Sequence, residues 1–149
     1  MPIALGADHA GVTLKEEVKR VLEDLNLPYR DFGTSSNESV DYPDYAARVA
    51  ASVASGDCDR AILVCGSGIG MAIAANKVRG VRAAPVSDLE TARLCRAHND
   101  ANVLALGARV TPRDRALEIV RTFLDTPFAG GRHQARVEKI AVLERDLCR

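Results

Sequence analysis

The fold of this chain is decided by a strand-to-helix junction, Ile62-Leu63-Val64-Cys65-Gly66-Ser67-Gly68-Ile69-Gly70-Met71. Its first residues are apolar and partly β-branched, which is typical of a buried strand, and the pattern after the glycine-rich turn is helical. Such a junction leaves backbone N–H groups unpaired at a helix N-terminus, where the helix dipole favours negative charge. We therefore expect a site for an anionic or anion-forming small molecule, with the Cys65 thiol and the Ser67 hydroxyl beside it.

Two plainer interpretations of the same residues stay open from the sequence. A glycine-rich turn after a strand can serve only to reverse the chain, and Cys65 can be an inert buried cysteine. The common phosphate and dinucleotide loops are not matched, because no Gly-Lys-Ser/Thr follows and the Gly-x-Gly-x-x-Gly spacing is missing. The position of Cys65 at the carboxyl end of a strand favours function, since open α/β sheets bind ligands there.

Composition and charge narrow the class of protein. The chain has 149 residues, enough for one domain with a substantial core and hardly enough for two. Its 20 basic and 20 acidic residues balance, so no general attraction to nucleic acid is expected. No signal peptide and no apolar run of the ~20 residues that cross a membrane is evident, which predicts a cytoplasmic protein without a membrane partner. The 4 cysteines and 3 histidines lack metal-ligand spacing, so we expect free thiols and no metal.

Apolar periodicity alternates between strand and helix along the chain. Short apolar runs predict strands at residues 3–6, 27–32, 60–64, 81–86 and 102–106. Helical spacing predicts helices over about 12–26, 41–55, 69–77, 89–97, 111–124 and 134–148. Asp88 is expected to cap the fourth of these helices, and Thr111 with Pro112 to start the fifth. The alternation predicts a Rossmann-like, three-layer αβα sandwich with a five-stranded, mainly parallel sheet, formed by a single domain over 1–149.

Polar residues next to the strand ends are the candidates for chemistry. Asp8 and His9 follow the first predicted strand and residues 65–70 the third, so we expect them at one edge of the sheet. His98 and Asn99 precede the fifth strand. A histidine in a loop is often an ordinary surface residue, but a thiol and a glycine-rich turn nearby favour function for His9.

Arginines form a second set of candidates. Arg132 and Arg136 follow Gly130-Gly131 and lie one helical turn apart, so both guanidinium groups can face one phosphate. Arg109, just beyond the fifth strand, is a third candidate. A salt-bridged helix start is the alternative for Arg132 and Arg136.

Six motifs occur in a fixed order along the chain. They are Gly6-Ala7-Asp8-His9-Ala10-Gly11, Asp41-Tyr42-Pro43, Cys65-Gly66-Ser67-Gly68-Ile69-Gly70, Ala74-Ala75-Asn76-Lys77, His98-Asn99-Asp100-Ala101-Asn102-Val103 and Gly130-Gly131-Arg132-His133. Together they resemble the ribose-5-phosphate isomerase B family, which also includes allose-6-phosphate and galactose-6-phosphate isomerases. The resemblance spans almost the whole chain.

The resemblance implies an activity. Members of the family interconvert aldose and ketose phosphates through a cis-enediolate, without a metal or an organic cofactor. The implied reaction is the interconversion of D-ribose 5-phosphate and D-ribulose 5-phosphate. Allose 6-phosphate, galactose 6-phosphate or a tetrose phosphate are alternative substrates, and a phosphosugar-binding protein without activity is a further alternative.

The resemblance also implies catalytic roles. Cys65 would be the base that moves the proton between C2 and C1. Ser67 would hold the enediolate oxygen as an oxyanion hole does, together with backbone N–H groups of the turn, those of Gly66, Gly68, Ile69 and Gly70. His98, with Asp8 as its neighbour, would assist opening of the furanose ring. Some members use a glutamate six positions after the cysteine, where this chain has Met71.

Binding roles follow from the same resemblance. Phosphate would be bound by His9, Arg109, Arg132 and Arg136. Tyr42 and Asn99 would contact sugar hydroxyls. Family members are dimers, sometimes tetramers, with each site completed across the interface, which implies a homodimer here. The carboxyl-terminal helix would lie at that interface, or else pack on its own sheet.

Overall fold

The sheet is parallel throughout the described part of the chain. A computed structural model describes residues 1–147. Its strands are β1 (Ile3–Ala7), β2 (Tyr29–Asp31), β3 (Arg60–Cys65), β4 (Ala83–Pro85) and β5 (Val103–Gly107). Its helices are α1 (Val12–Asp24), α2 (Tyr42–Ala54), α3 (Ile69–Ala75), α4 (Leu89–Ala97), α5 (Arg113–Asp125) and α6 (Arg132–Leu147). The strand order is β2-β1-β3-β5-β4, so the predicted α/β fold class is confirmed.

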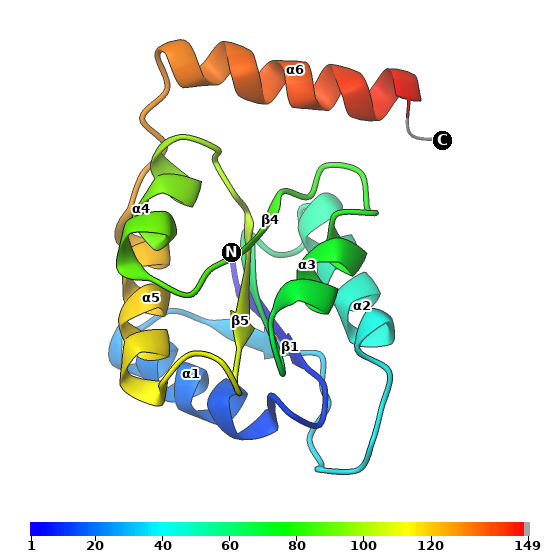
Figure 1. Cartoon of the computed structure of the whole chain (residues 1–149), viewed down its shortest axis with the longest axis vertical. Coiled ribbons are helices and arrows are strands. Elements are labelled where there is room, and N and C mark those ends of the chain that lie inside the picture. Colours follow the sequence, from blue (N-terminus) through cyan, green and yellow to red (C-terminus); the bar gives the residue numbers. More distant parts are fainter. Residues whose placement is uncertain (148–149) are drawn as a thin grey trace.

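Helices cover both faces of the sheet. Helices α1, α4 and α5 lie on one face, and α2 and α3 on the other (Figure 1). Because side chains alternate along a strand, Ile62 and Val64 of β3 enter the first core, and Leu63 and Cys65 enter the second. The thiol of Cys65 therefore projects from the end of β3 on the face covered by α2 and α3.

The bounds of several helices and strands differ from the prediction. The edge strands β2 and β4 are shorter than the apolar runs that predicted them, because each pairs on one side only and Pro85 has no N–H to donate. Asp88 caps α4 as expected, accepting a hydrogen bond from the Thr91 N–H at 2.7 Å. Thr111 does not cap α5. The helix begins at Arg113, and the Thr111 hydroxyl is buried without a hydrogen-bond partner.

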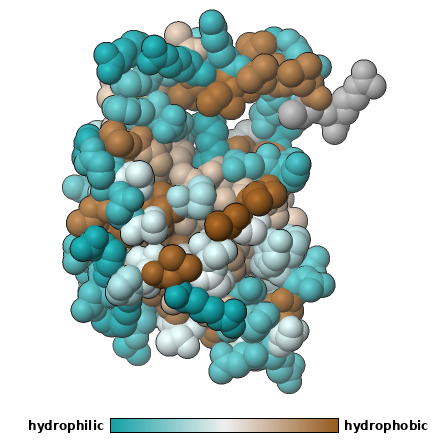
Figure 2. Space-filling model, viewed as in Figure 1, coloured by the Kyte–Doolittle hydropathy of each residue, from teal (hydrophilic) through white to brown (hydrophobic). Residues whose placement is uncertain are grey.

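Helix α6 stands apart from the sandwich. None of its residues is buried, and it crosses beyond the amino edge of the sheet (Figure 1). Its apolar side chains Ile140, Val142, Leu143 and Leu147 stay exposed, and Figure 2 shows an apolar band along this helix above a hollow. The hollow is a groove of about 550 Å³ between α6 and the β4 region. The helix therefore does not pack on its own sheet. Cys148, at the end of the predicted helix, lies outside the described residues.

No helix within residues 1–147 combines the length and the apolar character needed to span a membrane.

An ion pair made by a fully buried lysine anchors the loop after β2. Lys15 is fully buried, and its Nζ donates to Asp31 Oδ1 at 2.7 Å and to the Thr34 carbonyl at 2.6 Å. The Thr34 N–H in turn donates to the Ala7 carbonyl at 2.8 Å, at the end of β1. Lys15 thus connects α1 with the loop that flanks the carboxyl end of β1.

We expect Asp31→Asn to destabilise the protein by about 3 kcal/mol or more, because it leaves the charge of buried Lys15 without a carboxylate. Urea unfolding followed by circular dichroism measures this. Asp57→Asn, in an exposed turn, is the matched control. Equal free energies of unfolding for the two variants would show that the ion pair does not contribute to stability.

The same pair predicts a loss of stability in acid. Burial raises the pKa of Asp31, but hydrogen bonds from Lys15, Lys19 and the Gly33 N–H outweigh burial, so the pKa is lowered. An aspartate whose pKa is lower in the folded state stabilises that state at pH values above its unfolded-state pKa of about 4. This stabilisation is lost as the pH falls through the folded-state pKa. The stability gap between wild type and Asp31→Asn should therefore shrink below about pH 4. A gap of constant size down to strongly acidic pH would contradict the assignment.

Candidate active site

A crevice opens at the carboxyl edge of the sheet, where β1 and β3 lie side by side. The strand order reverses between these two strands, because the chain passes from β1 to β2 on one side and continues with β3 on the other. Open α/β sheets bind ligands at such a point. The cavity measures about 610 Å³ and is lined by Asp8, Tyr42, Cys65, Gly66, Ser67, Ile69, Gly70, Ile73, Arg109 and Val110.

The turn after β3 holds the thiol in this crevice. Cys65 is 4% exposed, and its Sγ accepts a hydrogen bond from the Gly68 N–H at 3.2 Å. Gly68 adopts φ +82°, a left-handed conformation that suits glycine, and is the N-cap of α3. The backbone of the turn thus holds the sulfur at a fixed place in the crevice, beside the N-terminus of α3.

The turn is packed directly against the end of β5. Backbone hydrogen bonds run from the Ala108 N–H to the Cys65 carbonyl at 2.8 Å and from the Arg109 N–H to the Gly66 carbonyl at 3.0 Å. A Cβ atom at Gly107 would lie 2.6 Å from the carbonyl carbon and oxygen of Ser67. Glycine is required at this position because the two backbones touch.

Ser67 lies exposed at the mouth of the turn. Its Oγ accepts a hydrogen bond from the Ile69 N–H at 3.2 Å. A hydroxyl that accepts one hydrogen bond still has its proton to donate. Ser67 can therefore donate to an oxygen atom bound in the crevice.

Asp8 and His9 follow β1 but lie differently. Asp8 is buried, and its Oδ1 accepts hydrogen bonds from the Ala10 N–H at 3.0 Å and the Gly11 N–H at 3.2 Å, which orders the turn into α1. The Nδ1 of His9 accepts from the Val40 N–H at 3.2 Å. In the neutral ring the proton is then on Nε2, which is available as a donor. Asp8 lines the crevice. His9 follows it in the chain, and its hydrogen bond with the Val40 N–H holds the long loop before α2 in place.

Tyr42 and Arg109 lie across the two ends of the glycine-rich turn. A Cβ atom at Gly70 would lie 2.5 Å from the Tyr42 ring, and one at Gly66 would lie 3.4 Å from the Arg109 guanidinium. Because Gly66 and Gly70 have no side chains, the turn leaves room for an aromatic ring at one end and a cation at the other. Arg109 thus brings a positive charge to the crevice that Cys65 also lines.

Two apolar residues of the rim were missed from the sequence. Ile73 and Val110 are 60% and 62% exposed and line the crevice. The spacing of Ile73 four residues after Ile69 places both on one face of α3, and this was a usable signal. Val110, in a loop, has no periodicity that would have marked it.

The predicted proximity of His98 to Asp8 is wrong within one chain. Helix α4 runs back against the strand direction, so His98 at its C-terminus lies at the amino edge of the sheet. There its ring stacks on that of His133, with centroids 4.0 Å apart and planes 14° from parallel. Asn99 lines the groove under α6, and Arg132 and Arg136 are in the first turns of α6. These residues form a second cluster, His98, Asn99, Arg132, His133 and Arg136, which we call the amino-edge cluster.

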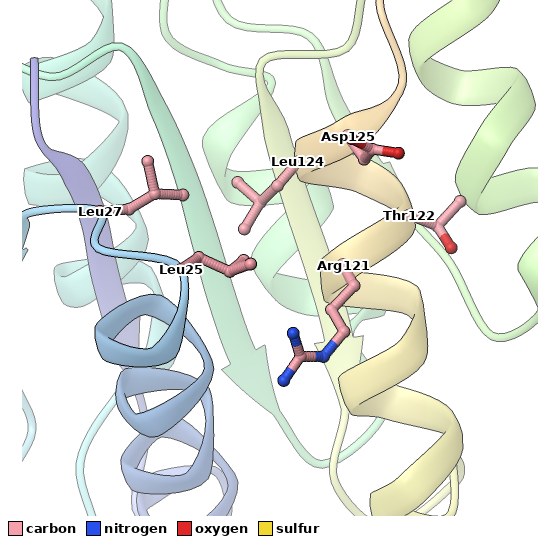
Figure 3. Close-up of a pocket in the computed structure, with 6 residues that line it drawn as sticks. All are labelled: Leu25, Leu27, Arg121, Thr122, Leu124 and Asp125. Atoms are coloured by element: carbon pink, nitrogen blue, oxygen red, sulfur yellow. The ribbon is translucent and has the colours of Figure 1, made fainter.

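A third cavity holds none of the predicted site residues. It measures about 400 Å³ and lies between the ends of α1 and α5 (Figure 3). Its walls are Leu25, Leu27, Arg121, Thr122, Leu124 and Asp125. Within residues 1–147, no group of three or more His, Cys, Asp or Glu side chains is placed to hold a metal ion.

Residues 3–140 match the ribose/galactose isomerase family. The chain belongs to this family. It is 48% identical over 143 residues to ribose-5-phosphate isomerase B of Escherichia coli, covering 96% of each chain. Its fold superimposes on ribose-5-phosphate isomerase B of Clostridium thermocellum with a TM-score of 0.95 at 52% identity, covering 97% of this chain and 98% of that one. Ribose-5-phosphate isomerase B of Mycoplasma genitalium, solved with bound ribulose-5-phosphate, has a TM-score of 0.93 at 41% identity, covering 97% of each chain.

The close approach at Gly107 predicts that Gly107→Ala lowers isomerase activity by about 10-fold or more, because the added methyl group displaces the turn that carries Cys65 and Ser67. Steady-state kinetics and urea unfolding of the same preparation separate the effect on the site from the effect on folding. A variant that is folded and fully active would show that the turn tolerates displacement.

Proposed function

We propose that this protein interconverts D-ribose 5-phosphate and D-ribulose 5-phosphate, with Cys65 as the base. The observation that carries the proposal is the thiol at the carboxyl end of β3, which accepts a backbone N–H and lies beside a hydroxyl and a guanidinium in one crevice. Family membership supports the reaction class. The ribulose-5-phosphate bound to the Mycoplasma genitalium relative supports a pentose phosphate as substrate.

The chemistry of the crevice fits a proton shuttle. A Cys65 thiolate would take the proton from C2 of the open-chain aldose and return it to C1, so the intermediate is an enediolate. Its negative oxygen needs donors that are already in place. The Ser67 hydroxyl and the N–H groups of the turn, from Gly66 to Gly70, would supply them. No redox or group-transfer partner is needed, because the hydrogen leaves and returns within one substrate molecule.

Phosphate binding and ring opening point to a second copy of the chain. Cys65 and Arg109 are at the carboxyl edge of the sheet, whereas the amino-edge cluster lies at the opposite edge. A homodimer in which the amino-edge cluster of one copy closes the crevice of the other would unite both sets. The exposed apolar band of α6 offers a surface for such an association.

In that dimer the roles divide between the copies. One copy would supply Cys65, Ser67 and Asp8 with Tyr42, His9 and Arg109. The other would supply His98 for moving a proton to or from the ring oxygen, Asn99 for a sugar hydroxyl, and Arg132 and Arg136 for phosphate. Arginine pairs suit phosphate because each guanidinium can donate two parallel hydrogen bonds.

Cys65→Ala should lower kcat for ribose 5-phosphate by about 10²- to 10⁴-fold, because it removes the base while leaving the crevice otherwise intact. The assay is ketose formation in excess EDTA. Cys58→Ala is the matched control, since Cys58 is also buried but lies away from the crevice. Retained turnover in Cys65→Ala would exclude the thiol as the base. Absence of turnover by the folded, reduced wild type would overturn the pentose phosphate assignment, and four- and six-carbon sugar phosphates would then be compared.

Mixing two inactive variants tests the shared site. After unfolding and refolding together, Cys65→Ala and His98→Ala chains should recover about a quarter of wild-type activity, because half of the dimers are mixed and each mixed dimer has one intact site. The measurement is activity before and after mixing, with each variant refolded alone as the control. Failure to recover activity, with mixed dimers present, would mean that Cys65 of one copy and His98 of the other do not act in one shared site.

A further inference from the structure

The stacked pair of His98 and His133 is not accounted for by the roles above. His133 is half-buried, and its ring covers one face of the His98 ring at a centroid distance of 4.0 Å. The 14° angle between the ring planes shows that the two rings are nearly parallel. While the stack is intact, the His133 ring covers one face of the His98 ring. A substrate can therefore reach His98 only at its other face or at its ring edge.

The backbone is built to bring these two rings together. Gly130 and Gly131 adopt φ +67° and +55°, and a Cβ atom would meet nothing within 4 Å at either position. Glycine is therefore needed there for the left-handed turn and not for space. The His133 N–H donates to the Gly130 carbonyl at 3.0 Å, and the Ala129 N–H donates to the Ala97 carbonyl at 2.9 Å. The first bond closes the turn at the start of α6, and the second joins the segment before α6 to the last residue of α4, directly before His98.

The charges around the pair favour a neutral His133. Burial lowers the pKa of His133, and the positive charges of His98, Arg132 and Arg136 lower it further. On the α4 side, the Asp100 carboxylate is engaged by Arg96 at 2.8 Å and by Arg82 at 3.4 Å. His133 can thus serve as a flat neutral surface while His98 gains and loses a proton.

We propose that His133 is a positioning residue for His98: its ring fixes the plane of the His98 imidazole, and it does not itself touch the sugar. His98 is at the C-cap of α4, where its N–H donates to the Leu94 carbonyl at 2.9 Å and the following residues leave the helix. A side chain at such a helix end has rotational freedom that the stack removes. The inference rests on the proposed role of His98 in opening the furanose ring.

The test separates ring opening from proton transfer at carbon. Ribulose 5-phosphate has no free hydroxyl that could close a furanose ring, so exchange of its C1 hydrogen in D₂O needs Cys65 but not His98. We expect His133→Ala to lower kcat for ribose 5-phosphate by about 10- to 100-fold, with KM little changed, and to leave C1 exchange at the wild-type rate. His133→Phe keeps a flat ring and should restore kcat to within about threefold of wild type. Gln134→Ala, in the same turn of α6 and exposed, is the matched control.

His98→Ala is measured alongside to keep the two proposals distinguishable. If it lowers ribose 5-phosphate turnover and spares C1 exchange, the role of His98 stands, and the His133 variants decide the inference. The inference is overturned if His133→Ala behaves as wild type, if it loses C1 exchange as well, or if His133→Phe fails to restore kcat. If His98→Ala itself loses C1 exchange, the proposed role of His98 fails, and the inference fails with it.

Discussion

The contact between two backbones, the turn at 66–68 and the end of β5, is the constraint on which the site depends. Gly107 allows an approach that any Cβ atom would block, and Gly68 supplies the left-handed turn. Hydrogen bonds from residues 108 and 109 complete the contact. Because of this contact, the Cys65 sulfur meets the Gly68 N–H, Ser67 lies at the mouth of the crevice, and Arg109 passes over Gly66. Thiol, hydroxyl and cation are thus placed by main-chain packing, which is stiffer than side-chain packing.

The polarity of a parallel sheet then divides the functional residues into two groups. Residues that follow strands gather at the carboxyl edge, and residues that follow helices gather at the amino edge. His98 and the arginines of α6 belong to the second group, together with an exposed apolar helix. In the dimer that we propose, the second copy brings the amino-edge group to the crevice, since one chain cannot fold its two sheet edges onto each other.

Much of this arrangement was predictable from the residues in sequence. The central strands were found because β1, β3 and β5 are buried on both faces and so read as continuous apolar runs. The predicted edge strands are too long, because the apolar residues that flank β2 and β4 pack from loops and do not pair in the sheet. The residue type of Thr111 predicts a cap, but α5 begins at Arg113 and the buried Thr111 hydroxyl has no hydrogen-bond partner. Most residues of the crevice were named, because they follow strands directly.

By itself, the sequence determined the α/β class and the glycine-rich turn with its thiol, which follow from the period of apolar residues and the conformations open to glycine. The reaction was implied by the resemblance of its ordered motifs to a known family, and not by these local patterns. The tertiary structure decided what lies near what: that His98 is far from Asp8, that it stacks on His133, and that α6 leaves its apolar side uncovered. Such relations depend on the direction in which each helix returns across the sheet, and no short stretch of sequence contains that information.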